Sequence, residues 1–286
     1  MSKPGEHAER AHSKFSASGS ERWLNCAASV ALEEMSPPSP DSPWSKEGTK
    51  AHEVLEQFLV YGAAPQDTPT EMLLHCRKAA EYITERIKTG VLLVEKRVYN
   101  SEIHDEMFGT CDAIIVGHGK FIHIIDFKYG AGHVVDPEEN TQLIQYALGV
   151  AEAYDWNFKT VVMTILQPRA GNDWAKTWEI SAKELKTKWL PLWKKGVARV
   201  ERGDAKPFPG SWCHWCRAKA ICPAKLEKKF NDVKNRFSDL TEGNENGKKE
   251  NKKSYHQEKS KSKKILESFK TEAEENGEAD DQADFY

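Results

Sequence analysis

The fold is decided by Gly109-Thr-Cys-Asp-Ala-Ile-Ile-Val-Gly-His-Gly-Lys-Phe-Ile-His-Ile-Ile-Asp-Phe-Lys128. Two runs rich in β-branched residues flank Gly117-His-Gly119, which predicts a tight turn between two strands. Side chains of a strand alternate between its faces, so Asp126 and Lys128 point the same way. Folding back at the turn brings Asp112 opposite Asp126, with Cβ atoms about 5 Å apart. The stretch therefore predicts a hairpin that gathers two carboxylates and a lysine.

This grouping of charges favours a metal site. Two carboxylates so close raise each other's pKa unless a cation neutralises them. A hard divalent cation such as Mg²⁺ or Mn²⁺ prefers carboxylate oxygen, and it polarises a phosphate and lowers the pKa of a water. Lys128 would then orient that water or stabilise the developing charge. The alternative is a surface hairpin with solvated charges, but Ile124, Ile125 and Phe127 indicate a buried strand, where unused charges are costly.

The segments around the hairpin predict an α/β fold with a mixed sheet flanked by helices. Four prolines between residues 36 and 43 indicate a connector that cannot continue a helix. Gly62 is a stop signal for the first long helix. The expected helices span 46–61, 70–88, 138–154 and 182–202, and the expected strands span 92–99, 108–116, 120–128 and 160–167.

Two of the predicted helices offer further polar residues. His52 lies at helical spacing with Leu55 and Leu59, on or beside the inward stripe, although a histidine there is also typical of an ordinary core position. Gln142 and Tyr146 are separated by four residues and so share one helix face. The alternative for this pair is a routine half-buried helix.

The order of His52, Asp112, Asp126-Phe127-Lys128 and Gln142-x-x-x-Tyr146 resembles the PD-(D/E)xK nuclease superfamily. It is similar to the branch with the RecB nuclease domain and the CRISPR-associated Cas4 exonucleases, over about residues 13–225. The resemblance implies a restriction-endonuclease-like core. The third motif reads Asp-x-Lys instead of the commoner Glu-x-Lys.

The same resemblance implies roles for the motif residues. His52, Asp112, Asp126 and the backbone carbonyl of Phe127 would hold Mg²⁺ or Mn²⁺. Lys128 would be the catalytic lysine. Gln142 and Tyr146 would position the active site or the DNA strand.

The six cysteines fall into two groups. Cys76 and Cys111 stand alone in apolar segments and are expected in the core. Cys213, Cys216 and Cys222 lie within ten residues and, with a distant fourth cysteine, suit one soft metal centre.

The fourth cysteine would be Cys26, which joins residues 23–28 to residues 211–225 through the bound metal. In the resembled branch, one cysteine before the nuclease motifs and three after them hold a [4Fe–4S] cluster. Structural zinc with His214 as an extra ligand, and unliganded thiols, are the alternatives.

Composition divides the chain into an arm at 1–14, a nuclease domain at 15–238 and a tail at 239–286 whose polar, charged sequence predicts disorder. The tail ends in an acidic stretch tipped by Phe285 and Tyr286, which resembles the acidic tips of bacterial single-stranded DNA-binding proteins. It would recruit such a protein or an annealing protein, or compete with DNA for the enzyme's groove; a featureless linker is the alternative.

No apolar run approaches the roughly 20 residues that span a bilayer, and the polar N-terminus carries no signal sequence, so a cytoplasmic protein is expected. The near balance of 41 Lys+Arg against 44 Asp+Glu leaves nucleic acid open as a partner, because binding needs only a local basic groove. Together the motifs predict a metal-dependent DNA exonuclease, which the resemblance associates with phage recombination or replication. The rivals are an endonuclease of the same fold and a non-catalytic DNA-binding scaffold.

Overall fold

The structure is a computed structural model that describes residues 13–38, 42–87, 90–117 and 120–242. Most of the expected arm and tail lies outside these residues, and with it the expected partner-binding tip. The chain forms two compact units: Met1–Ser18 with Pro40–Trp189, and Gly19–Ser39 with Leu190–Tyr286. None of the described helices is both long and apolar enough to cross a membrane.

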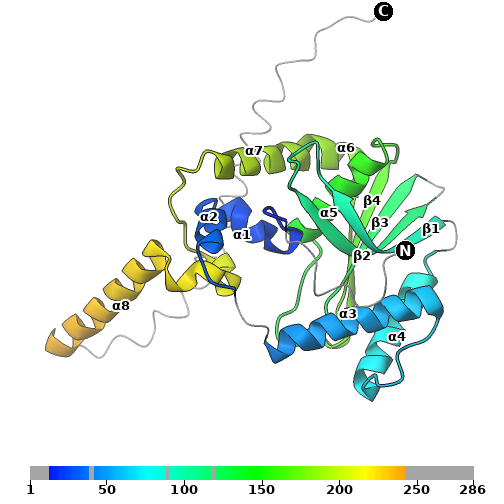
Figure 1. Ribbon diagram of the computed structural model, residues 1–286, viewed down its shortest axis with the longest axis horizontal. Helices are drawn as coiled ribbons and strands as arrows, with labels where there is room; N and C mark the ends of the chain where they lie inside the picture. Colours follow the sequence, from blue (N-terminus) through cyan, green and yellow to red (C-terminus); the bar gives the residue numbers. More distant parts are fainter. Residues whose placement is uncertain (1–12, 39–41, 88–89, 118–119, 243–286) are drawn as a thin grey trace, which may run out of the picture. The chain divides into compact units, whose positions relative to one another are not determined.

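The first unit is built on a five-stranded sheet in the order β1-β2-β3-β4-β5 (Figure 1). Neighbouring strands are antiparallel except β3 and β4, which are parallel. This arrangement confirms the predicted α/β fold with a mixed sheet. The strands are β1 (Gly90–Tyr99), β2 (Phe108–Gly117), β3 (Phe121–Phe127), β4 (Thr160–Leu166) and β5 (Ala175–Ser181).

Two helices pack together and cover one face of this sheet: α3 (Pro43–Tyr61) and α4 (Thr70–Thr84) (Figure 1). Their buried side chains form one apolar cluster with Ala113 and Ile115 of β2 and with Ile125 and Phe127 of β3. Because strand side chains alternate, Asp126 lies on the opposite face. The apolar faces of β2 and β3 thus fix which way the polar residues between them point.

Helix α3 begins earlier than the sequence indicates. Pro43 was expected to belong to the connector, but it occupies the first turn of the helix, where a missing N–H costs nothing. Ser42 caps the helix by accepting a hydrogen bond from the N–H of Ser45 at 3.0 Å. The helix ends as predicted at Gly62, whose φ of 73° suits glycine.

Helix α5 (Thr141–Ala153) crosses between the parallel strands β3 and β4. It begins three residues later than expected because the side chain of Asn140 caps it, accepting hydrogen bonds from the N–H groups of Gln142 and Leu143. Asn140 therefore fixes where the helix begins. Gln142 lies in the first turn of the helix and donates a hydrogen bond to Asp126.

The predicted helix at 182–202 is interrupted. It consists of α6 (Ala182–Glu184), the π-helical turn η3 (Leu185–Trp189) and α7 (Leu190–Glu201). Pro191 has no N–H to donate to the preceding turn, which accounts for the change in hydrogen bonding just before it.

The second unit contains α1 (Ser20–Asn25), α2 (Ala28–Glu34), α7, the short helices η4 (Ser211–Trp215) and η5 (Arg217–Ala220), and α8 (Pro223–Glu242). Helices α1 and α7 meet closely: Trp23 lies edge-on to Trp193 at 6.4 Å. A Cβ atom at Gly196 would lie 2.5 Å from Cδ2 of Leu24, so glycine lets the two helices approach without displacing that side chain. Segments from both ends of the chain thus share one small core.

A buried histidine on β3 makes the stability of the first unit depend on pH. Nε2 of His123 lies 2.7 Å from Oγ1 of Thr164. Burial lowers the pKa of His123 to about 4, and the charge of Arg86 adds to this effect. The folded protein therefore holds His123 neutral, whereas the unfolded chain takes up a proton below about pH 6.5.

We expect this histidine to remove on the order of 3 kcal/mol of stability as the pH falls from about 6.5 to about 4. Urea unfolding of wild type and His123→Leu at pH 7.5 and pH 4.5 measures it, because the leucine variant lacks the titrating group. Equal losses of unfolding free energy in the two proteins would contradict the assignment.

Candidate functional site

The antiparallel pairing of β2 and β3 brings Asp112 and Asp126 together. Ala113 pairs with Ile125, so Asp112 stands opposite Asp126 one position further along the ladder. Oδ2 of Asp112 also accepts a 2.6 Å hydrogen bond from the N–H of Phe127. Both aspartates are buried, at 9% and 2% exposure. The register that buries Ile114 and Ile124 therefore also fixes the two carboxylates side by side.

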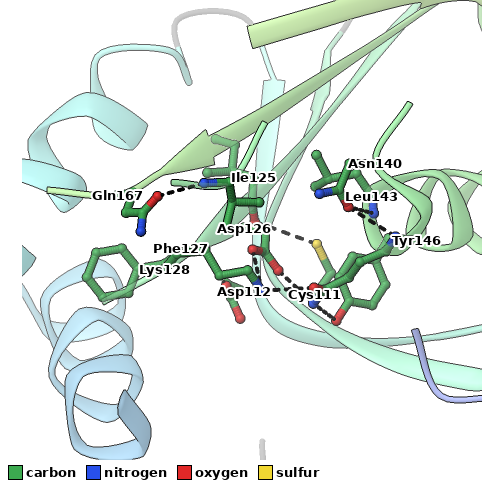
Figure 2. A network of polar contacts seen from close by, with 12 residues as sticks. Cys111, Asp112, Ile125, Asp126, Phe127, Lys128, Asn140, Leu143, Tyr146 and Gln167 are labelled. Atoms are coloured by element: carbon green, nitrogen blue, oxygen red, sulfur yellow. Dashed lines mark hydrogen bonds and ion pairs between the residues drawn. The ribbon is translucent and has the colours of Figure 1, made fainter. Parts of the chain in front are cut away.

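Asp126, Lys128 and Gln142 form a closed triangle of polar contacts, and Figure 2 labels Asp126 and Lys128 among the surrounding residues. Nζ of Lys128 lies 2.9 Å from Oδ2 of Asp126 and donates to Oε1 of Gln142 at 2.8 Å. Nε2 of Gln142 donates to Oδ1 of Asp126 at 2.9 Å and to the Tyr146 hydroxyl at 3.1 Å. One glutamine on α5 thus holds the lysine, the carboxylate and the phenol of Tyr146 in fixed relation.

Helix α3 adds His52 from the other side. Its Nδ1 atom lies 3.2 Å from Oδ1 of Asp112, and its ring stands edge-on to the Phe127 ring at 5.5 Å. Burial opposes its positive charge, but the charge of Asp112 and the hydrogen bond to it raise the pKa of His52 to about 9. The structure therefore brings together the side chains of all the residues that the sequence motifs placed at the site.

The two carboxylates differ electrostatically. Burial opposes ionisation of Asp112, but the charge of His52 and their hydrogen bond lower the pKa of Asp112 overall. Burial raises the pKa of Asp126 despite the nearby charge of Lys128. Burial also disfavours the charge on Lys128, yet Asp126 raises the lysine pKa. Of the two carboxyl groups, Asp126 is thus the one whose pKa burial raises overall.

Glu95 is a further candidate that sequence reasoning missed. One ligand atom each from His52, Glu95 and Asp112 all lie within 4.8 Å of one another. Glu95 falls between the paired positions Val94 and Lys96 of β1, opposite Asp112, and its φ of 47° is unusual for a strand. The available signal was a lone carboxylate in the β1 run Leu92-Leu-Val-Glu95, but its left-handed backbone could not be foreseen.

The residues of this site fit a hard divalent cation. Carboxylate oxygens and an imidazole nitrogen converge on one place, which is a donor set suited to Mg²⁺ or Mn²⁺. Of the described residues, none donates a well-directed hydrogen bond to the buried Oδ2 atom of Asp126, although Lys128 lies beside it. A buried carboxylate oxygen with spare acceptor capacity is what an additional cation requires.

In the second unit, four cysteines line one small hollow, part of which is open to solvent. They are Cys26, Cys213, Cys216 and Cys222, and all are buried. Cys76 and Cys111 are fully buried in the first unit, as expected of core thiols. The pairing of one early cysteine with three late ones follows from the packing of α1 and α2 with η4 and η5.

Backbone amides point at two of these sulfurs. The N–H of Phe208 donates to Sγ of Cys26 at 3.3 Å, and the N–H of Gly210 donates to Sγ of Cys213 at 3.4 Å. Burial raises the pKa of Cys26 and raises that of Cys216 to about 11, so both are thiols when no metal is bound. Four thiols around one hollow, with amide donors already in place, fit a thiolate-bound metal centre.

The family model for a protein of unknown function, DUF2800, matches residues 12–284. The chain belongs to this family. The match spans the strands, helices and cysteines described above, so both candidate sites are part of the DUF2800 region.

Solved structures similar to this DUF2800 chain include three exonuclease-related proteins. A candidate exonuclease of Eubacterium rectale is 10% identical over 76% of this chain and 92% of its own, with a TM-score of 0.44. An alkaline exonuclease of Laribacter hongkongensis is 13% identical over 64% and 95%, with a TM-score of 0.28. A phage-related exonuclease of Haemophilus somnus 129PT is 14% identical over 62% and 91%, with a TM-score of 0.28. At such sequence identities and TM-scores, structural similarity does not assign an activity to this chain. The basis for a function is therefore the geometry of the site.

Proposed function

We propose that this DUF2800 chain is a Mg²⁺- or Mn²⁺-dependent deoxyribonuclease that hydrolyses phosphodiester bonds from DNA ends. The observation that carries the proposal is the closed triangle formed by the buried Asp126 with the half-buried Lys128 and Gln142, beside Asp112 and His52. Such a network costs free energy of folding because it concentrates charge away from water. A role in function explains why the protein keeps it. Metal-dependent hydrolysis of a phosphodiester can use this combination of metal-binding carboxylates and a fixed cation.

Each residue would have a distinct part in the reaction. His52, Asp112, Asp126 and the Phe127 carbonyl would hold the divalent cation, with Glu95 beside them. That cation would polarise the phosphate and lower the pKa of an attacking water. Lys128 is held by two partners where its ammonium can stabilise negative charge that develops on the phosphate.

The remaining two residues would support this arrangement. Gln142 would keep Lys128 and Asp126 in register through its two ends. Burial raises the pKa of Tyr146 well above its ordinary value, so its hydroxyl stays protonated and can donate to a phosphate oxygen. The preference for DNA ends, the RecB and Cas4 branch and a role in phage recombination or replication rest on the resemblance of the motif order.

The cysteine site is proposed to hold a [4Fe–4S] cluster. The supporting observations are the four buried thiols around one hollow and the two amide donors aimed at their sulfurs. Its part would be structural, because binding joins segments from both ends of the sequence within the second unit. Zinc in the same site is the alternative that metal analysis would reveal.

We expect purified protein to release nucleotides from linear DNA with Mg²⁺ or Mn²⁺ and to leave covalently closed circular DNA intact, because an exonuclease needs an end. Parallel 5′ and 3′ end labels would report the polarity, and excess chelator is the control. Cleavage of closed circles at a comparable rate would identify an endonuclease instead. Absence of cleavage on every substrate with either metal would contradict the proposal.

A further inference from the structure

Gln167, directly after β4, carries a buried side chain that no motif includes. It is 3% exposed. Its Nε2 atom donates to the backbone carbonyls of Gly130 at 2.6 Å and His133 at 2.7 Å, and its Oε1 atom accepts from the N–H of Val135 at 3.0 Å. Figure 2 shows the side chain at the end of its strand with one of these bonds dashed. A single amide thus binds three backbone groups of one segment more than 30 residues away in sequence.

The middle of that segment, residues 130–135, has few other recorded contacts, whereas Tyr129 before it is buried and residues 136–140 are linked by hydrogen bonds of their own. Residues 128–140 contain no helix or strand, and residues 130–134 are exposed. A side-chain carbon added at Gly130 or Gly132 would meet nothing within 4 Å, so neighbouring atoms do not confine the backbone there. Exposed backbone without packing or regular hydrogen bonds is free to move. The three bonds to Gln167 are therefore the main fixed points along residues 130–135 that the structure records.

The same segment joins two members of the polar triangle. It begins at Lys128 and ends just before Gln142, whose side chains bond each other at 2.8 Å. The strand that carries Gln167 also holds the first end of the segment, because the N–H of Lys128 donates to the carbonyl of Leu166 at 2.8 Å. The C-terminal end of β4 and the residue after it thus form hydrogen bonds with the segment at Lys128 and again at residues 130–135.

The geometry points to Gln167 as a positioning residue for the nuclease reaction: its amide fixes residues 130–135 and thereby the placement of Lys128 relative to Gln142. This inference rests on the proposed function. The side-chain hydrogen bonds that the structure records for Gln167 all go to residues 130–135 and none to a proposed metal ligand, so its effect passes through the segment. Displacement of a catalytic group by about 1 Å costs about 100-fold in rate, so loosening the segment acts on turnover more than on binding.

The test uses Gln167→Met, which keeps the length and volume of the side chain and removes all three hydrogen bonds. Gln145→Met is the matched control: Gln145 is also buried, and its side chain donates to a backbone carbonyl outside residues 128–140, that of Phe15 at 2.7 Å. Gln167→Asn retains the amide on a shorter stem and serves as a second variant if the methionine variant does not fold.

Two measurements are needed, both on the full chain. Hydrogen exchange of the Val135 amide should be protected in wild type and Gln145→Met and should become fast in Gln167→Met, whether or not the protein cleaves DNA. With labelled linear DNA and Mn²⁺, Gln167→Met should lower kcat by about 10- to 100-fold with KM changed less than threefold, and Gln145→Met should keep kcat.

The outcomes separate this inference from the proposed function. An active wild type together with a Gln167→Met variant of unchanged kcat would overturn the positioning role alone. Unchanged hydrogen exchange of the Val135 amide in that variant would overturn the claim that Gln167 fixes residues 130–135. A wild type that cleaves no DNA would overturn the proposed function and the positioning role with it. The exchange data would still show whether Gln167 fixes residues 130–135.

Discussion

Asp126→Asn is expected to lower kcat for DNA cleavage by about 1,000-fold. The substitution keeps the shape of the side chain but removes the charge that would bind the cation and hold Lys128 at 2.9 Å. The unfolding free energy of the metal-free protein should fall as well, because the substitution leaves the half-buried ammonium of Lys128 without its carboxylate partner.

Single-turnover digestion of end-labelled DNA measures the rate, and urea unfolding without metal measures stability. Asp67→Asn is the matched control, because Asp67 is an exposed aspartate that pairs with Lys50 at 3.0 Å and should tolerate the change. Near wild-type cleavage by Asp126→Asn with Mg²⁺ present would show that the active site lies elsewhere.

Cys26→Ser is expected to abolish the visible absorbance of anaerobically purified protein and to lower the free energy of unfolding by roughly 4–5 kcal/mol. Wild type should be brown, as expected of thiolate-bound iron–sulfur. The stability loss is large because a centre shared by Cys26 and Cys213 closes a very long loop of chain. Absorption spectra, iron and zinc analysis and denaturant unfolding provide the measurements.

Cys76→Ser is the control for this experiment. Cys76 is fully buried in the first unit, so its replacement should cost some stability while the protein stays coloured. Colourless wild type with one zinc per chain would favour the zinc alternative, and colourless protein without either metal would contradict a metal centre.

The hairpin was predictable from sequence because two independent signals agreed. The turn expected after Gly117, of which residues 118–119 lie outside the described part of the chain, predicted the register, and the alternation of apolar residues predicted the faces. The observed pairing of β2 with β3 accordingly places Asp112 opposite Asp126. The i, i+4 spacing of Gln142 and Tyr146 similarly predicted a shared face, and they are hydrogen-bonded. The spacing of residues in the sequence was therefore sufficient to predict side-chain positions within regular strands and helices.

Other features depended on contacts that local pattern does not contain. Glu95 reaches His52 and Asp112 only through a left-handed backbone within β1, which propensity does not indicate for glutamate. Gln167 binds an irregular segment, so no spacing rule connects the two. The π-helical turn before Pro191 arises from one missing donor inside a strongly helical pattern, and boundary errors at Pro43 and Asn140 likewise came from caps.

The two units are also interleaved along the chain: residues 40–189 of the first interrupt residues 19–39 and 190–286 of the second. A ribosome therefore makes Cys26 first, then every strand of the sheet, and only afterwards Cys213, Cys216 and Cys222. Chains are synthesised at roughly 5–20 residues per second and domains generally fold as units, so Cys26 waits on the order of ten seconds for its partners. During that interval the sheet can form while its N-terminal cysteine is still unmatched, and assembly of the cysteine site is the later event in the life of each new molecule.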